Sequence, residues 1–261
     1  IASLDDSNPQ PDLITYSTVI KGYCKMKNIE KVLDIYNFLQ SKEEFEIDEV
    51  MFNTILDGLL KSEKYHEALK IYEHMKNKKT SRSNATYSIL IKIYSKLNLV
   101  DNAWEIYNEM LNLSIKPSLI TCTSIIQILI KSKRIQKAID IFNEIINDGA
   151  QPDQVMYNVI INGCVFNGRL QNACEYLFQT FEKNIKICND VYKNILCNLL
   201  TNKIMEINHK IQMTIRICKE IKERQIEIDN ELFSKVMKMI YKNSNKIYDV
   251  IWNDGVLFKI T

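Results

Sequence analysis

The sequence is poor in glycine and proline. Its 261 residues include only 6 glycines and 4 prolines, too few for the many tight turns of a β-sandwich or β-barrel. Ile, Leu, Lys and Glu are frequent instead, and their abundance favours helices. The composition therefore predicts an all-α protein.

The seven cysteines form no recognisable framework. They are odd in number and no two have the C-x-x-C spacing, which argues against both a disulfide framework and a zinc site. The three histidines form neither an i, i+4 pair nor a cluster with cysteines. We therefore expect no metal, no cofactor and a reducing compartment. The residues concerned are Cys24, Cys122, Cys164, Cys174, Cys188, Cys197, Cys218, His66, His74 and His209.

Long apolar runs are also missing. None approaches the roughly 20 residues of a membrane span, and the N-terminus lacks the architecture of a signal peptide, so we expect no membrane partner. Because the sequence begins with Ile1 rather than Met, we expect a piece of a longer or processed chain, and a targeting peptide outside it stays open. The net charge is only +2, so affinity for a polyanion must come from where the lysines lie.

Motifs of common enzymes are absent. The sequence contains no G-x-x-x-x-G-K-[ST], G-x-S-x-G or H-E-x-x-H, and no H-x-E with P-C-x-x-C. We therefore expect a chain that is not an enzyme and has no catalytic residues. An enzymatic domain outside this sequence, guided by it, stays an alternative.

One short segment recurs along the chain. An aromatic residue, a small polar residue and an apolar pair follow one another in ITYSTVI, VMFNTIL, ATYSILI and VMYNVII. Counted from the third residue before the aromatic, the repeats start 36, 35, 35 and 35 residues apart. We number them 1 to 5; they start at Leu13, Glu49, Asn84, Leu119 and Gln154, with Cys122 in the aromatic position of repeat 4.

A second segment recurs in phase with the first. KYHEALKIYEHM, LVDNAWEIYNEM, RIQKAIDIFNEI and RLQNACEYLFQT place an alanine at strict intervals of 35 residues. Apolar residues within each repeat have the three- and four-residue spacing of one helix face, so each repeat is a helix pair. A pair this short must stack on its neighbours to bury its apolar face. The alanines are Ala68, Ala103, Ala138 and Ala173, with Val32 at the same place in repeat 1.

Turn-forming residues punctuate this pattern. Asn28, Asn98 and Asn167-Gly168 lie between the paired helices, and Pro117-Ser118 and Pro152-Asp153 lie where repeats meet. The expected segments are 1–12, the end of a truncated repeat; 13–48, 49–83, 84–118, 119–153 and 154–188, five regular repeats; 189–229, a longer divergent repeat with its extra residues in TNKIMEINHK; and 230–261, a degenerate repeat that caps the stack.

A helix pair of 35 residues that reads aromatic, Asn/Ser/Thr, x, apolar, apolar and ends in Pro-Asp or Pro-Ser resembles the P-type pentatricopeptide repeat family. The likeness covers residues 13–188 well and 189–245 loosely. The tetratricopeptide repeat has a different step, of 34 residues, and a Trp/Leu/Gly/Tyr pattern that is absent here. The resemblance implies a right-handed superhelical α-solenoid of about six to seven helix-turn-helix repeats. It further implies binding of single-stranded RNA, one base per repeat, in a mitochondrion or plastid.

In that family two residues of each repeat read the base: the residue after the aromatic and the last residue of the repeat. The resemblance implies G for repeats 1 and 4, C for repeat 2, a purine for repeat 3 and a pyrimidine for repeat 5. With N-terminal repeats on the 5′ side, the core is 5′-G-C-purine-G-pyrimidine-3′. Lys193 replaces the short polar reader in the next repeat, so reading is expected to degrade there. The implied pairs are Ser17 with Asp48, Asn53 with Ser83, Ser88 with Ser118, Thr123 with Asp153, and Asn158 with Cys188.

Two further sets of residues follow from the resemblance. An apolar residue near the start of each repeat flanks the base, and a lysine near the end of each first helix contacts phosphate. The lysines stand in register until Phe166 and Thr201 break the row. The flanking residues are Ile14, Val50, Ala85, Ile120 and Val155, and the lysines are Lys25, Lys61, Lys96 and Lys131.

Each set also has a structural explanation. Short polar residues at a helix start bond to the backbone, lysines complement a helix C-terminus, and the repeated aromatics and alanines belong to packed faces. A second functional interpretation is a scaffold that binds proteins, as other helical solenoids do; protein partners and self-association stay open. Under the RNA hypothesis the protein stabilises, protects or processes an organellar transcript by covering it.

Overall fold

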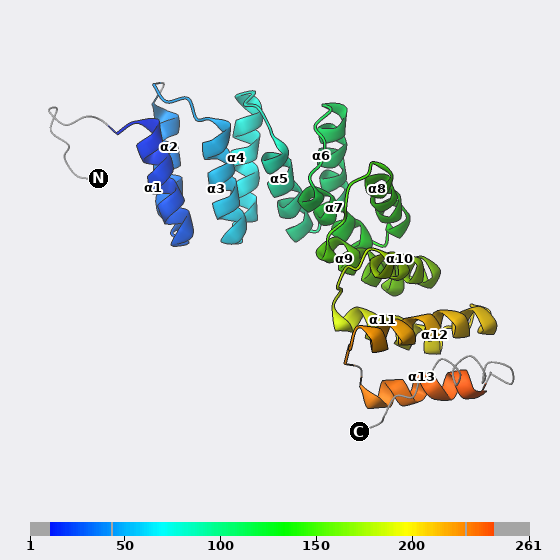
Figure 1. Cartoon of the computed structure of the whole chain (residues 1–261). Helices are drawn as coiled ribbons and strands as arrows, with labels where there is room; N and C mark the ends of the chain where they lie inside the picture. Colours follow the sequence, from blue (N-terminus) through cyan, green and yellow to red (C-terminus); the bar gives the residue numbers. More distant parts are fainter. Residues whose placement is uncertain (1–10, 43, 228, 243–261) are drawn as a thin grey trace. The chain divides into compact units, whose positions relative to one another are not determined.

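The computed structural model describes residues 11–42, 44–227 and 229–242, and within these ranges it contains thirteen α-helices and no strand (Figure 1). The sequence expectations for residues 1–10 and for a closing helix at 246–261 lie outside the described residues. The helices are α1 Leu13–Lys25, α2 Ile29–Ser41, α3 Glu49–Lys61, α4 Tyr65–Asn77, α5 Asn84–Lys96, α6 Val100–Asn112, α7 Leu119–Lys131, α8 Ile135–Asn147, α9 Gln154–Phe166, α10 Leu170–Glu182, α11 Asn189–Thr201, α12 Ile207–Glu223 and α13 Asn230–Lys242.

The first helix of every repeat begins at the residue where the sequence repeat begins. Three of these starts have the same cap: Oδ1 of Asp12, Asp48 and Asp153 accepts the backbone N–H three residues ahead, each at 2.8 Å. This bond satisfies one of the amides that a helix start leaves without a partner. An acid at the end of one repeat therefore starts the first helix of the next.

In the turn between the paired helices, one residue has a left-handed backbone conformation, with positive φ. These residues recur with the sequence period, although only one of them is glycine. A left-handed backbone costs an ordinary residue roughly 1–2 kcal/mol, so the period, and not the residue type, marks the position. The residues are Lys27, Glu63, Asn98, Lys133 and Gly168, with φ between 56° and 73°.

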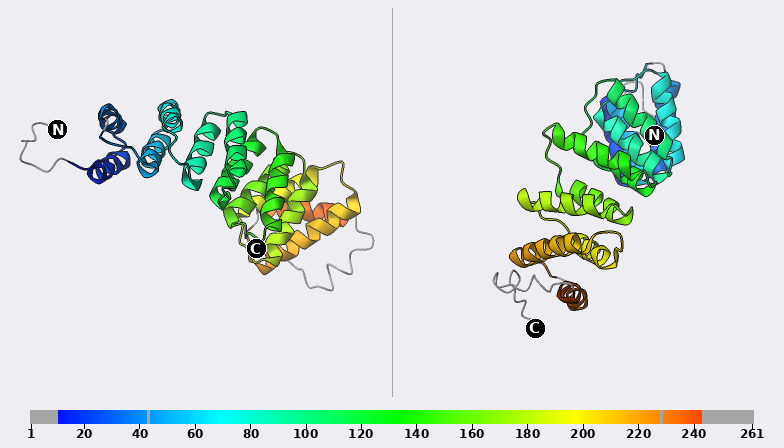
Figure 2. Two further views of the ribbon diagram at one scale, coloured as in Figure 1. Left: turned by 90° about the horizontal axis from the view of Figure 1, so that it is seen from above. Right: turned by 90° about the vertical axis from the view of Figure 1, so that its right-hand side faces the viewer.

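The helices form two compact units, Ile1–Ile128 and Leu129–Thr261, with the division inside α7. In the N-terminal unit, α1 packs on α3 and α3 on α5, while α2, α4 and α6 each pack on the first helix of their own repeat. Two layers result, which Figure 1 and Figure 2 show as neighbouring rows of ribbons. The first helices form one continuous layer within this unit.

The C-terminal unit follows the same plan, with α9 against α11, α11 against α13, and α10 and α12 against the first helices of their own repeats. The longer divergent repeat at 189–229 is repeat 6. Its connecting loop spans 202–206 and its second helix, α12, has 17 residues instead of 13. The extra residues expected in TNKIMEINHK are therefore shared between that loop and α12.

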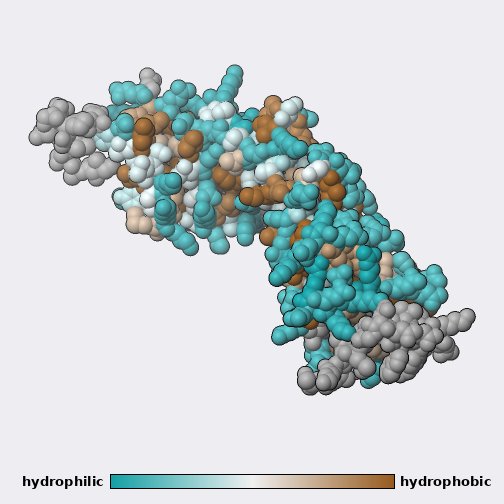
Figure 3. Space-filling model, viewed as in Figure 1, coloured by the Kyte–Doolittle hydropathy of each residue, from teal (hydrophilic) through white to brown (hydrophobic). Residues whose placement is uncertain are grey.

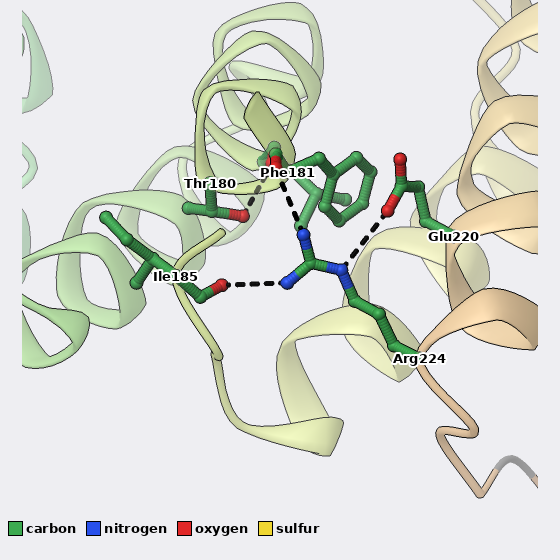
Figure 4. A network of polar contacts seen from close by, with 6 residues as sticks. Thr180, Phe181, Ile185, Glu220 and Arg224 are labelled. Atoms are coloured by element: carbon green, nitrogen blue, oxygen red, sulfur yellow. Dashed lines mark hydrogen bonds and ion pairs between the residues drawn. The ribbon is translucent and has the colours of Figure 1, made fainter. Parts of the chain in front are cut away.

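Arg224, the residue after α12, anchors the longer helix to α10. Its guanidinium donates to the carbonyls of Ile185 at 3.2 Å and Phe181 at 3.1 Å, and pairs with Glu220 at 3.1 Å (Figure 4). It also lies over the Phe181 ring, 5.2 Å from the centroid. Phe181 lies in the last turn of α10 and Ile185 lies three residues beyond its end, so Arg224 joins the end of α12 to the end of α10 and the loop that follows it.

The core consists of the residues that recur in the sequence. The aromatics of the first helices and the alanines of the second are buried, and each of the four alanines is fully inaccessible. The buried aromatics are Tyr16, Phe52, Tyr87, Tyr157 and Tyr192.

None of the helices in the described ranges has the length and hydropathy of a bilayer span. The face of the C-terminal unit that Figure 3 shows is mostly hydrophilic.

Gly58 allows the close approach of α3 to α1, and it provides a test of this packing. A Cβ at Gly58 would lie 2.3 Å from Cys24 Sγ and 2.9 Å from Cys24 Cβ, whereas a Cβ at the equivalent Gly22 would meet nothing within 4 Å. We expect Gly58→Ala to lower the free energy of unfolding by about 1–3 kcal/mol in urea denaturation. The control Gly22→Ala should raise it by about 0.5–1 kcal/mol. Equal stabilisation by both variants would contradict this packing.

Candidate functional site

The residues that follow the aromatics lie on the first helices of their repeats, four of them in the N-terminal unit and Asn158 in the C-terminal unit. Four are half-buried, while Ser88 is more covered, with 9% of its surface exposed. Thr123 Oγ1 donates to the Leu119 carbonyl at 2.7 Å, so for Thr123 the structural explanation by backbone bonding holds. Its hydroxyl oxygen can still accept a second hydrogen bond. The half-buried residues are Ser17, Asn53, Thr123 and Asn158.

The last residues of the repeats stand immediately before the next first helix. Asp48 and Asp153 cap their helices through Oδ1, and Ser118 Oγ accepts the Thr121 N–H at 3.2 Å. Ser83 and Cys188 are also N-cap residues but make no side-chain cap bond. Capping thus accounts for part of the preference for Asp and Ser here. A capping carboxylate keeps its second oxygen as an acceptor.

The flanking positions are apolar and exposed. Ile14 is 75% exposed, Val50 67%, Ile120 63% and Val155 58%, and Ala85 is exposed as well. Each follows the first residue of its helix. Packing within the chain does not account for an apolar residue that recurs in solvent at one place of the repeat.

The lysines of the row are all exposed, and each is the last residue of its helix: α1, α3, α5 and α7 end at Lys25, Lys61, Lys96 and Lys131. Lys61 forms an ion pair with Asp57 at 2.6 Å. At the same place α9 ends in Phe166, which is 75% exposed, and α11 ends in Thr201. Favourable interaction with a helix C-terminus applies to every lysine of the row, so position alone does not decide their role.

A groove of about 640 Å³ in the N-terminal unit brings members of all three sets together. Its lining includes the reading pair of repeat 2, the flanking residues of repeats 2 and 3, and the lysines that end α1 and α3. These are Asn53 and Ser83, Val50 and Ala85, and Lys25 and Lys61. Lys21, Lys27, Glu49 and Asp57 line it as well, so the polar pair lies in one hollow with two apolar side chains, four lysines and two carboxylates.

The reading pairs differ in how they are connected. Asn158 bonds directly to Cys188, with Oδ1 accepting the Cys188 N–H at 3.2 Å and Nδ2 3.2 Å from Sγ. Asn53 and Ser83 are joined through a third residue, Glu49. In the described part of the chain, no hydrogen bond joins Ser17 to Asp48 or Ser88 to Ser118. Thr123 and Asp153 belong to different compact units.

Sequence reasoning missed the first residue of the repeats. Glu49 Oε1 accepts the Ser83 N–H at 3.0 Å, and Asn84 Oδ1 accepts the Ser118 N–H at 3.0 Å. Burial raises the pKa of the Glu49 carboxyl, but the hydrogen bonds from Ser83 and Ser81 lower it more, so this pKa lies below its ordinary value. The only signal in the sequence is a polar residue at the repeat start, which Leu13 and Leu119 lack.

Three buried cysteines have thiols that are poor nucleophiles at neutral pH. Burial raises the pKa of the Cys164, Cys174 and Cys218 thiols to about 12, so they stay protonated at neutral pH. Cys188 and Cys197 are exposed and not in disulfides. Within the described ranges, no group of three or more His, Cys, Asp and Glu side chains is arranged to hold a metal ion.

Comparison with known families agrees with the repeat geometry. The sequence model described as the PPR repeat family matches residues 47–96, 83–128 and 117–165, and two models described as PPR repeat match 7–31 and 155–185. Together they span more than half of the chain. The chain belongs to the pentatricopeptide repeat family. No curated protein matches it significantly in sequence.

Solved pentatricopeptide repeat structures share the fold. Maize PPR10 matches with 18% identity and a TM-score of 0.59, covering 96% of this chain and 36% of PPR10; PPR10 has also been solved in complex with an 18-nt psaJ RNA element. The Arabidopsis thaliana nuclear proteinaceous RNase P 2 matches with 15% identity and a TM-score of 0.65, over 74% of this chain and 43% of that one.

The PPR domain of Arabidopsis protein-only RNase P 1, solved with tRNA, matches with 11% identity and a TM-score of 0.61, over 68% of this chain and 93% of that one. At these identities the comparison shows the α-solenoid fold alone. The chain spans only about a third of the length of PPR10.

Asp48 is both the N-cap residue of α3 and the last residue of repeat 1. Its contribution to stability through the cap can be measured without RNA. Because Oδ1 caps α3, we expect Asp48→Ala to lower the free energy of unfolding by about 1 kcal/mol in urea denaturation, and Asp48→Asn to lower it much less, since Asn also caps well. Ser83→Ala, at an N-cap without a side-chain bond, is the control and should cost less than Asp48→Ala. Equal losses for Asp48→Ala and Ser83→Ala would show that the cap at α3 contributes little.

Proposed function

We propose that this pentatricopeptide repeat protein binds single-stranded RNA along its layer of first helices, one base per repeat. The groove of repeats 1 to 3 carries the proposal, because it combines every element that such a site needs. Asn53 and Ser83 offer hydrogen-bonding groups to a base edge, Val50 and Ala85 offer apolar contact to its faces, and the lysines offer contacts to phosphate. RNA binding by the structural neighbours supports the same conclusion.

The reading pairs suggest the order 5′-G-C-purine-G-pyrimidine-3′ for repeats 1 to 5. In repeat 1, the Asp48 oxygen that does not cap α3 can accept from N1–H and N2–H of guanine, while adenine presents an acceptor at N1. In repeat 2, the Asn53 amide suits the acceptors of cytosine. Each mismatched base is expected to cost on the order of 1–3 kcal/mol, so two wrong letters reduce binding about a hundredfold or more.

The biological role that fits this binding is passive. A strand covered by ordered repeats is shielded from exonucleases and from local base pairing, so stabilisation, protection or processing of a transcript follows from occupancy alone. We place the protein in a mitochondrion or plastid on the strength of its family. The repeats themselves act by binding and not by catalysis.

Binding of short RNAs measured by fluorescence anisotropy tests the proposal. We expect an RNA containing 5′-GCAGU-3′ to bind about tenfold or more tightly than the same bases scrambled or than its DNA version. Four lysine contacts predict a slope of log K against log salt near −3, at about 0.7 per contact. Absence of RNA binding, or a slope near zero, would contradict the proposal and favour a protein-binding scaffold.

Asp48→Asn tests base reading in repeat 1. The variant keeps the cap but replaces an acceptor by a group that can donate, so we expect the preference at the first base to move from G towards A by roughly tenfold in the ratio of the two affinities. Preference at the fourth base, assigned to Thr123 and Asp153, is the internal control and should stay unchanged. An unaltered G-to-A ratio at the first base would remove Asp48 from the reading pair.

A further inference from the structure

The carboxylate of Glu49 joins the two side chains that repeat 2 offers to its base. Oε1 accepts from Asn53 Nδ2 at 3.2 Å and from the Ser83 N–H at 3.0 Å. Oε2 accepts from Ser81 Oγ at 3.0 Å. Glu49 thereby links α3 to the residues just before α5, and it lies in the lining of the same groove.

These contacts determine which way the Asn53 amide faces. A carboxylate has no proton to donate, so the amide nitrogen and not the amide oxygen must face Glu49. On its other side, Asn53 Oδ1 accepts from Thr86 Oγ1 at 2.9 Å. A flipped amide would place Oδ1 against the carboxylate and lose that bond, whereas the Thr86 hydroxyl could accept from the amide nitrogen and donate to Glu49 Oε1, 3.3 Å away. The orientation is therefore set by Glu49 on α3, and Thr86 on α5 contacts both side chains.

An amide held in this orientation would distinguish cytosine from uracil. A held amide keeps its second N–H for the base, and this donor suits N3 of cytosine, which is an acceptor. Uracil has N3–H at that place and would need the amide oxygen instead. We propose that Glu49 is a positioning residue that makes repeat 2 prefer cytosine over uracil. The inference rests on the proposed RNA binding and adds a residue outside the reading pair.

The charge on Glu49 fits this role. The hydrogen bonds that lower its pKa keep it ionised near neutral pH, where an ionised carboxylate is an acceptor only. A negative charge repels phosphate, so the charge of Glu49 does not serve RNA affinity, although Glu49 lines the same groove as Lys25 and Lys61. Its place there is explained by the bonds it accepts.

Two other repeats show what Glu49 adds. In repeat 3, Asn84 accepts the Ser118 N–H in the same way, but the reader Ser88 has no amide to orient. In repeat 5, Asn158 Oδ1 accepts the Cys188 N–H at 3.2 Å and Nδ2 lies 3.2 Å from Cys188 Sγ, so this amide is oriented by its own partner. In repeat 2 a residue outside the reading pair does this.

The test measures the affinities of four RNAs that differ only at the second base, for the wild type, Glu49→Ala, Glu49→Gln and the control Asn84→Ala. We expect the wild type to prefer C over U by roughly tenfold or more, and Glu49→Ala to bring this ratio to within about threefold. Glu49→Gln keeps an acceptor at the same place and should restore most of the ratio. Asn84→Ala should leave the ratio at the second base unchanged.

Thermal unfolding monitored by circular dichroism verifies that each variant is folded. If Glu49→Ala does not fold, Thr86→Val removes the bond on the other side of the amide with a side chain of similar shape, and it too should lower the ratio. Equal changes in affinity for all four RNAs, with the ratio preserved, would overturn the inference but leave RNA binding intact. A wild type that binds none of the four would overturn both proposals.

Discussion

A two-helix repeat of this length cannot bury enough apolar surface to be stable alone, and this constraint governs the rest of the structure. The first helix of each repeat must lie against the first helix of the next, as α1, α3 and α5 do. A glycine at the contact of α1 with α3 allows that approach, and the alanines of the second helices are fully buried. Stacking in register then repeats every position of the helix along one layer.

This repetition turns ordinary helix chemistry into a row of equivalent groups. Asp48 starts a helix by using one oxygen for the cap, and under the proposed function it is also the last residue of a reading pair. A lysine that suits a helix C-terminus becomes one cation in a series. In that proposal the same residues serve folding and binding, so the two have to be measured separately in each variant.

Under the proposed function, the two reading residues of a repeat are not sufficient to describe how it recognises a base. Glu49 and Thr86 hold the amide of Asn53 from two helices, and in the fifth repeat Asn158 bonds to its own partner. Two asparagines at the same place of their repeats are thus held by different partners. Such differences arise at the boundary between repeats, where one repeat supplies the support for the side chain of another.

The sequence alone determined the period, and with it the family, the start of each first helix and the buried aromatics, because stacking imposes the same requirements every 35 residues. Residue types did not reveal the left-handed positions, since Lys27 and Glu63 adopt that backbone without being glycine. Only the tertiary structure decided that Ser88 is covered, that α12 is lengthened and held by Arg224, and that Glu49 orients Asn53. Apart from the bond between Asn53 and Glu49, four residues apart on one helix, these contacts join residues more than thirty positions apart or depend on how tightly two helices pack, and no local pattern in a sequence specifies such distances.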